Sequence, residues 1–171
     1  AKAPNTIPLI TGLEAISISP EELQALCAAF GTTSAAPMLH IRGHTPESHL
    51  LPHCFLKSCC ITVEEFRQLW NKFNASGACI DLVAIGSPHS SLAECRRFAE
   101  LLDGKKCHNA TQTILTVGRD VFSDAASEGI LTHLMRAGVR VIPDICWCSI
   151  TEPVFPKKAK IVMTNSGKYS H

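Results

Sequence analysis

The stretch "CIDLVAIGSPHSSLAECRRFAELLDG" (residues 79–104) decides the fold, because it joins an apolar strand to an amphipathic helix through a short polar turn. Residues 79–86 form a nearly continuous apolar run, which is typical of a strand covered on both faces. Ser91 is followed three residues later by Glu94, a capping box that predicts a helix over 91–104. A strand that leads directly into a helix indicates a parallel sheet with helical crossovers.

The same alternation recurs along the rest of the chain. We expect further strands at 36–43, 111–118, 139–146 and 158–165, and helices at 19–32, 62–74 and 119–138, the last broken near Gly129. The fold class that follows is α/β, a mainly parallel sheet with helices on both faces. We expect a single α/β domain over residues 1–171. The segment 44–61, where periodicity is weakest, is expected to be a functional loop or a contact between subdomains.

Composition excludes several classes of protein. With 46% hydrophobic and 18% charged residues, the chain can bury a core, so disorder is not expected. A net charge of +1 without a basic cluster argues against nucleic acid or an anionic membrane as partner. No apolar run is long enough to predict a membrane span. Nine cysteines, an odd number, and no signal-peptide pattern indicate reduced thiols and a cytoplasmic location.

Polar residues follow each predicted strand. In open parallel sheets, ligands bind beyond the carboxyl ends of the strands. If these strands are parallel, one edge of the sheet gathers acids, bases, hydroxyls, two cations and a thiol. The segments concerned are 44–47, 87–91, 119–120, 146–149 and 165–168.

The turn at 87–91 has two compatible interpretations. In the first it is only a helix N-terminus, in which Pro88 sets the turn, Ser91 caps the helix and His89 is a solvated bystander. In the second it is a site for an anion or a developing alkoxide, drawn there by free N–H groups and the helix dipole. A capping residue can also present its side chain to a ligand.

Cys146 is a buried strand-end thiol, a metal ligand or a nucleophile with His89 as its base. We expect Asp144 and Trp147 to raise the pKa of this thiol, which favours the ligand over the nucleophile. Iron–sulfur clusters generally need three or four thiolates, so the ligand set in this chain looks incomplete. A Cys/His hydrolase would rest only on Cys146 with His89.

Other candidates have equally plain structural explanations. Lys168 and Arg119 are natural partners for a substrate anion, or simply surface charges. Glu47 is a possible helix-start acid. His40 lies within a predicted strand, where a hydrogen-bonded core histidine is the default.

Four stretches together resemble the catalytic region of the aconitase X family. They are "MLHIRGHTPES", "VAIGSPHSSLAE", "VIPDIC" and "VMTNSGKYSH", which occur in the family's order, and "ISPEELQALCAAF" and "ITVEEFRQLWNKFN" resemble its helices. The G-x-P-H-x-S and N-S-G-K-Y-x-H motifs are specific, whereas T-P-E and D-x-C alone are weak. The resemblance covers nearly all of this chain but only the C-terminal part of the family's large region.

The resemblance implies a hydro-lyase that uses an iron–sulfur cluster as a Lewis acid, while a base removes a proton from the carbon beside the leaving hydroxyl. By motif match Cys146 would be one cluster ligand, the remaining ligands lying outside this chain. The implied catalytic residues are Ser87, His89 and Ser91. The implied substrate-binding residues are His40, Thr45, Glu47, Arg119, Asn165, Ser166 and Lys168.

Ser87 before Pro-His resembles the single-chain branch of the family, which includes cis-3-hydroxy-L-proline dehydratases. The two-subunit branch, which dehydrates phosphomevalonate, has Cys there. The expected substrate is therefore a small hydroxy acid such as cis-3-hydroxy-L-proline. The chain departs from the family at residues 117–118, where Thr-Ser is common, and neither His44 nor Cys148 belongs to the motif.

The family's N-terminal part and its small swivelling domain do not occur in this chain. We therefore expect them as partners, supplied by the remainder of the same enzyme, and we expect little or no dehydratase activity from the chain alone. The alternative is a non-catalytic α/β module that binds a small anion or a partner protein.

Overall fold

The computed structural model describes residues 2, 4–50, 57–74, 79–149 and 154–170. The chain separates into two compact units. Unit 1 comprises Ala1–Gly77 with the last two residues, and unit 2 comprises Ala78–Tyr169. The sequence predicts one α/β domain over residues 1–171, whereas the packing divides the chain at residue 77.

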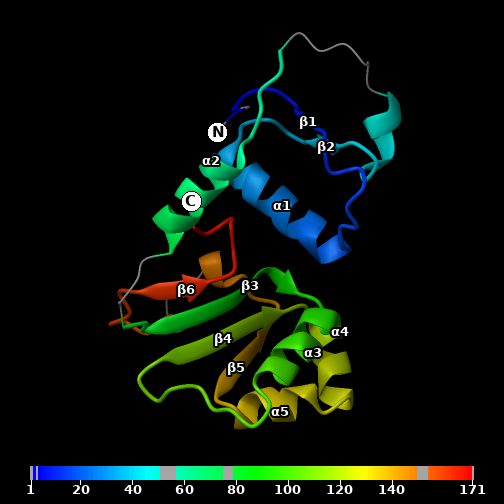
Figure 1. Ribbon diagram of the computed structural model, residues 1–171. Helices are drawn as coiled ribbons and strands as arrows, with labels where there is room; N and C mark the ends of the chain where they lie inside the picture. Colours follow the sequence, from blue (N-terminus) through cyan, green and yellow to red (C-terminus); the bar gives the residue numbers. More distant parts are fainter. Residues whose placement is uncertain (1, 3, 51–56, 75–78, 150–153, 171) are drawn as a thin grey trace. The chain divides into compact units, whose positions relative to one another are not determined.

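A four-stranded parallel sheet forms the framework of unit 2 (Figure 1). Its strands are ordered β5-β4-β3-β6, so the earliest two lie at the centre. They are β3 (Leu82–Ser90), β4 (Gln112–Val117), β5 (Val139–Pro143) and β6 (Val162–Thr164). Every pairing is parallel, which confirms the predicted sheet.

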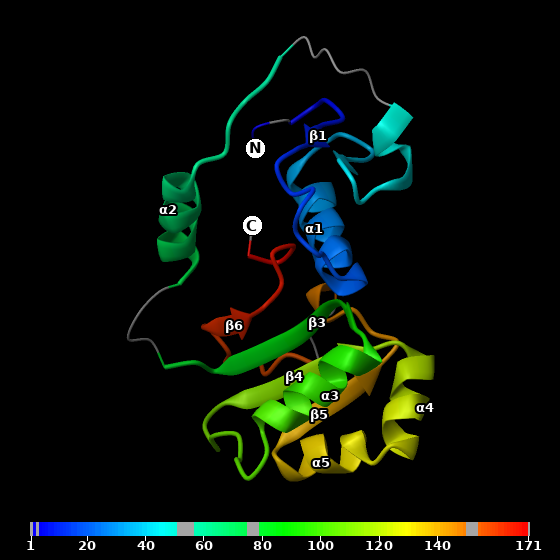
Figure 2. The same ribbon diagram turned by 45° about the vertical axis from the view of Figure 1, so that its right-hand side comes forward.

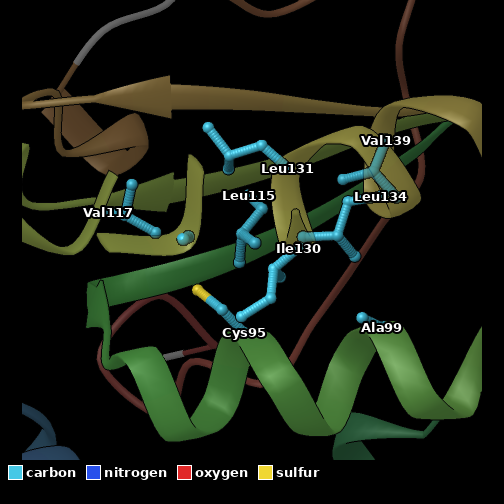
Figure 3. Packing of buried hydrophobic residues seen from close by; sticks show 9 residues of the cluster. Cys95, Ala99, Leu115, Val117, Ile130, Leu131, Leu134 and Val139 are labelled. Carbon is cyan, nitrogen blue, oxygen red and sulfur yellow. The ribbon is translucent and has the colours of Figure 1, made fainter. Parts of the chain in front are cut away.

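The two faces of this sheet are covered differently. Helices α3 (Leu92–Leu101), α4 (Arg119–Ser127) and α5 (Ile130–Arg136) pack on one face around a cluster that includes Leu115 and Leu134 (Figures 2 and 3). The other face is covered by Trp147 and Val154 rather than by an α-helix. Trp147 begins the short 3-10 helix η2 (Trp147–Ser149). Within unit 2, the described α-helices therefore lie on one face of its sheet.

Strand β3 bends where it leaves the sheet, and a glycine makes the bend possible. Gly86 has φ +98°, and a Cβ placed there would lie 2.2 Å from the Thr116 carbonyl oxygen. The Thr116 hydroxyl donates a 2.6 Å hydrogen bond to the Gly86 carbonyl. The register with β4 shifts between Ile85 and Ser90, so β3 is irregular around Ser87 and pairs with β4 again at Ser90.

Capping boxes begin the three longest of the described helices, as the sequence predicts. In each, the cap hydroxyl accepts the backbone N–H three residues on, and a glutamate returns a bond to the cap N–H. The pairs are Ser19–Glu22 for α1 (Pro20–Thr33), Thr62–Glu65 for α2 (Val63–Phe73) and Ser91–Glu94 for α3. Gly129, at φ +74°, separates α4 from α5, which confirms the predicted break.

Unit 1 holds a small parallel pair of strands. β1 (Leu9–Ile10) pairs with β2 (His40–Ile41), and the 3-10 helix η1 (Pro46–Leu50) follows. The predicted strand at 36–43 is therefore only two residues long in the structure, and it belongs to this pair rather than to the sheet of unit 2.

The helices of unit 1 have little interior to cover. Neither α1 nor α2 has a buried residue. The apolar face that periodicity predicts for α2 is present but exposed, through Val63, Phe66, Leu69, Trp70 and Phe73. None of the described helices has the length and apolar character needed to cross a membrane.

Candidate active site

Three strand ends of unit 2 meet at the carboxyl edge of its sheet. Ser87 lies in the last part of β3, Cys146 and Cys148 follow β5, and Ser166 follows β6. The Ser87 hydroxyl lies 2.6 Å from the Cys148 sulfur and 3.6 Å from the Cys146 sulfur. The two sulfurs are 3.0 Å apart.

The turn after β5 explains why both cysteines reach this point. Asp144 adopts φ +59°, its N–H donates to the Val117 carbonyl at 2.9 Å, and its carboxylate accepts from Arg119 at 2.6 Å. Trp147 is buried, with its ring centroid 4.6 Å from that of Tyr169. Since the Trp147 side chain occupies the interior, the cysteines on either side of it lie at the edge of the sheet.

Ser87 is held by a second contact. It is 3% exposed, and its carbonyl accepts a 2.5 Å hydrogen bond from the Ser166 hydroxyl. The Ser166 N–H donates to the Thr164 hydroxyl at 3.0 Å, which fixes the turn after β6. The peptide bond between Ser87 and Pro88 is cis. The ends of β3 and β6 are thus joined side by side.

The pKa of Cys146 is lower than that of an ordinary thiol, so the predicted increase is wrong. Burial raises the pKa, but hydrogen bonds from Cys148 and Ser87 and the positive charge of Lys168 outweigh it. The Asp144 carboxylate, which was expected to oppose them, forms an ion pair with Arg119. Burial raises the pKa of Cys148, and the neighbouring Cys146 raises it further. Cys146 therefore ionises first, and Cys148 keeps its proton longer.

Residues 87–91 were interpreted either as a helix N-terminus or as a ligand site, and Ser91 and His89 support different interpretations. The Ser91 hydroxyl accepts from the Glu94 N–H at 3.1 Å, so its observed contact is the helix cap. His89 is half-buried on β3, and its Nε2 is buried without a hydrogen-bond partner among the described residues. A buried ring nitrogen without a partner is costly, so His89 is the residue of this turn that a ligand would satisfy.

The predicted anion-binding residues differ in availability. Arg119 is paired with Asp144, although its side chain is 83% exposed. Lys168 is half-buried, and its charge acts on both cysteine thiols. Asn165 is exposed directly after β6. Lys168 therefore supplies the positive charge at this edge.

His40, Thr45 and Glu47 belong to unit 1, so they are not strand ends of the same sheet. His40 is 9% exposed, and its Nδ1 has no partner among the described residues. The Thr45 hydroxyl accepts from the Ile41 N–H at 3.0 Å and closes the turn after β2. Glu47 is exposed on η1. All the predicted site segments were expected at one edge of one sheet, but only the strand ends of unit 2 share such an edge.

Cys148 is the site residue that motif matching missed. The signal was present in the sequence, because Cys-x-Cys places two thiols within one turn. In the described ranges, no group of three or more His, Cys, Asp or Glu residues could hold a metal ion. The two sulfurs nevertheless fit part of the donor set of a thiophilic metal such as iron. Cys54 and His171 lie outside the described residues.

Comparisons with known proteins agree over both units. Residues 1–71 match the family model described as the aconitase X second domain, and residues 80–171 match that of the aconitase X third domain. The solved structure of aconitase X from Thermococcus kodakaraensis, in its holo-form, superposes with a TM-score of 0.87 at 27% sequence identity. That match covers 99% of this chain and 42% of the other.

Curated relatives give the chemistry of similar proteins. The chain is 37% identical to cis-3-hydroxy-L-proline dehydratase from Hypocrea jecorina, over 99% of this chain, and 37% identical to that of Pseudomonas aeruginosa, over 96%. It spans 30% of the length of each. It is also 28% identical, over 96% of this chain, to the phosphomevalonate dehydratase large subunit of Methanocaldococcus jannaschii, of which it spans 40%.

Proposed function

The chain belongs to the aconitase X family, and from this premise we propose that it forms part of the catalytic region of a hydro-lyase, an enzyme that eliminates water from a small hydroxy acid. The proteins that are similar to this chain over nearly its whole length are dehydratases, and this similarity supports the reaction class. The remainder of the active enzyme, including an N-terminal part and a small domain, would have to be supplied from outside these 171 residues.

The observation that carries the proposal is the meeting of three strand ends in unit 2. It brings two thiols and two hydroxyls together, with the charge of Lys168 acting on the thiols. Hydrophobic packing of the sheet holds these groups, so they need little reorganisation to receive a substrate.

At this edge, Cys146 would be one of the ligands that hold an iron–sulfur cluster. When bound, it would supply Lewis-acid stabilisation for the departing hydroxyl. The lowered pKa of Cys146 supports this assignment, because the thiolate is the form that binds metal. Ser87 faces the same sulfur and borders the substrate position.

The other residues bind substrate and move protons. Lys168 provides the charge that a substrate carboxylate requires, and Asn165 adds an amide beside it. His89 Nε2 is our candidate to hold the proton taken from carbon, because it has no competing partner among the described residues. Arg119, bound to Asp144, positions the turn that carries Cys146. Ser91 acts at this site through the helix it caps.

We propose cis-3-hydroxy-L-proline, or a close relative of it, as the substrate. Two observations support this choice over phosphomevalonate. The chain shares more sequence identity with the cis-3-hydroxy-L-proline dehydratases than with the phosphomevalonate dehydratase large subunit. By the family resemblance, the phosphomevalonate branch has Cys at the position where this chain has Ser87. The cysteines in the described ranges are all free, which fits a reducing compartment, and we propose the cytosol.

A segment exchange tests the proposal. The part of the Pseudomonas aeruginosa dehydratase that aligns with this chain is replaced by the 171 residues, and turnover of cis-3-hydroxy-L-proline is measured after iron reconstitution. We expect the chimera to dehydrate this substrate, and the isolated 171-residue chain to show little or no turnover.

The control is a second chimera that carries Ser166→Ala, which removes the bond to the Ser87 carbonyl. It should fold like its parent and turn over more slowly. A chimera with the parent's circular dichroism and iron content but no dehydration would contradict the proposal, as would substantial turnover by the isolated chain.

A further inference from the structure

We propose that Cys148 is a second sulfur ligand, beside Cys146, for the metal of this site. The inference rests on the proposed function for the identity of the metal, but its evidence is the local geometry after β5. Family resemblance points to Cys146 alone and gives Cys148 no role.

The backbone turn brings the pair close together. On a strand, side chains two residues apart share a face of the sheet but lie about 6–7 Å apart along it. Strand β5 ends at Pro143, and Trp147 starts a 3-10 helix, so Cys146 and Cys148 leave the strand geometry. Their sulfurs are 3.0 Å apart, with the buried Trp147 ring between them in sequence. The anchoring of Trp147 fixes both sulfurs on one side of the turn.

The surroundings suit a soft cation. The Ser87 oxygen faces both sulfurs, at 2.6 Å from Cys148 and 3.6 Å from Cys146. Thiols are weak hydrogen-bond donors and weak acceptors, so the two thiols and the Ser87 hydroxyl satisfy one another poorly. Thiolate donors select iron, zinc or copper(I) over magnesium and calcium. Two ligands within three residues also need little chain ordering to chelate one ion.

Cobalt(II) is the probe, because its thiolate charge-transfer absorbance grows with the number of bound sulfurs. The titration uses the reduced 171-residue chain without oxygen, in a Cys59→Ser/Cys60→Ser background that removes the exposed neighbouring pair. Variants Cys146→Ser and Cys148→Ser are compared with Cys27→Ser, a matched change of an exposed cysteine in unit 1. Circular dichroism confirms that each variant is folded.

We expect Cys148→Ser to lower the charge-transfer absorbance at saturating cobalt to about half, and Cys27→Ser to leave it unchanged. Full absorbance and unchanged affinity in folded Cys148→Ser would overturn the proposal. So would a background protein that binds no cobalt through sulfur. The titration needs no turnover, so Cys148 can fail as a ligand while the chimera remains active.

Discussion

Units 1 and 2 are built from the same kinds of helix signal, yet they bury very different amounts of apolar surface. In unit 2, residues such as Leu82, Ile114 and Leu134 are completely buried. In unit 1, α2 has an equally good capping box but leaves Phe66 64% and Trp70 69% exposed. A cap determines where a helix begins, whereas burial determines how much the helix contributes to stability.

The same difference separates the candidate site residues. Those that lie within contact distance of one another are at or just after the ends of strands in unit 2, whose core fixes their positions. Those of unit 1 lie in or just after a strand of only two residues. We therefore expect substitutions in unit 2 to unfold the chain or disable the site, and equivalent substitutions in unit 1 to be mild.

The largest contrast is expected between two glycines. Gly86→Ala would place a Cβ 2.2 Å from a backbone oxygen at φ +98°, so we expect it to lower the free energy of unfolding by about 4 kcal/mol. Gly31→Ala, in α1, meets no atom and should raise the stability of the helix by about 0.5–1 kcal/mol. Urea unfolding followed by circular dichroism measures both. Similar effects at the two positions would refute the contrast.

A second pair compares leucines. Leu134→Ala removes a side chain that is 0% exposed in the helix–sheet interface of Figure 3. It should lower the free energy of unfolding by about 3 kcal/mol. Leu69→Ala, on the exposed face of α2, should cost less than about 1 kcal/mol. The same urea titrations decide the matter. A cost for Leu69→Ala as large as that for Leu134→Ala would mean that the α2 face is buried in solution.

The smallest expected effect is a dependence on pH. Burial, assisted by the charge of Glu94, raises the pKa of Cys95 to about 11 from its ordinary value of 9.0. The folded state therefore favours the protonated thiol, and this stabilisation is fully present below pH 9. It is lost as pH rises from about 9 to 11, because the unfolded thiol ionises first; the loss should reach about 2 kcal/mol.

The variant Cys95→Ala isolates this effect, because it removes the thiol from the core beneath α3. Its unfolding free energy should fall less steeply over that pH range than that of the parent chain. Cys27→Ala, which changes an exposed thiol, should keep the parent's slope. Identical slopes for the parent and Cys95→Ala would show that Cys95 does not titrate as described.

Local signals made much of the fold predictable. Capping pairs such as Ser91–Glu94 and the apolar runs of β3 and β4 specify elements within a few residues of their own positions. Which strands share a sheet depends on long-range packing, so the assignment of 36–43 to the main sheet was wrong. The covering of the second face by Trp147 and Val154 has no periodicity to reveal it.

The candidate site was predictable only in part, for a similar reason. Motif matching found Ser87, Cys146 and Ser166, and strand order then explains their proximity. The role of Asp144 could not be seen in the sequence, because its charge is neutralised by Arg119, 25 positions away in the chain. The orientation of Cys148 depends on a turn that begins at a residue with positive φ, which no local pattern indicated.

The most direct test of the account is a matched pair of cysteine substitutions in the chimeric dehydratase, one in each unit. Cys146→Ala should abolish bound iron and reduce turnover of cis-3-hydroxy-L-proline by more than about 100-fold, because it removes a proposed ligand. Cys27→Ala should leave both unchanged. Equal iron content and equal turnover in the two variants would contradict the placement of the catalytic site at the edge of the unit 2 sheet.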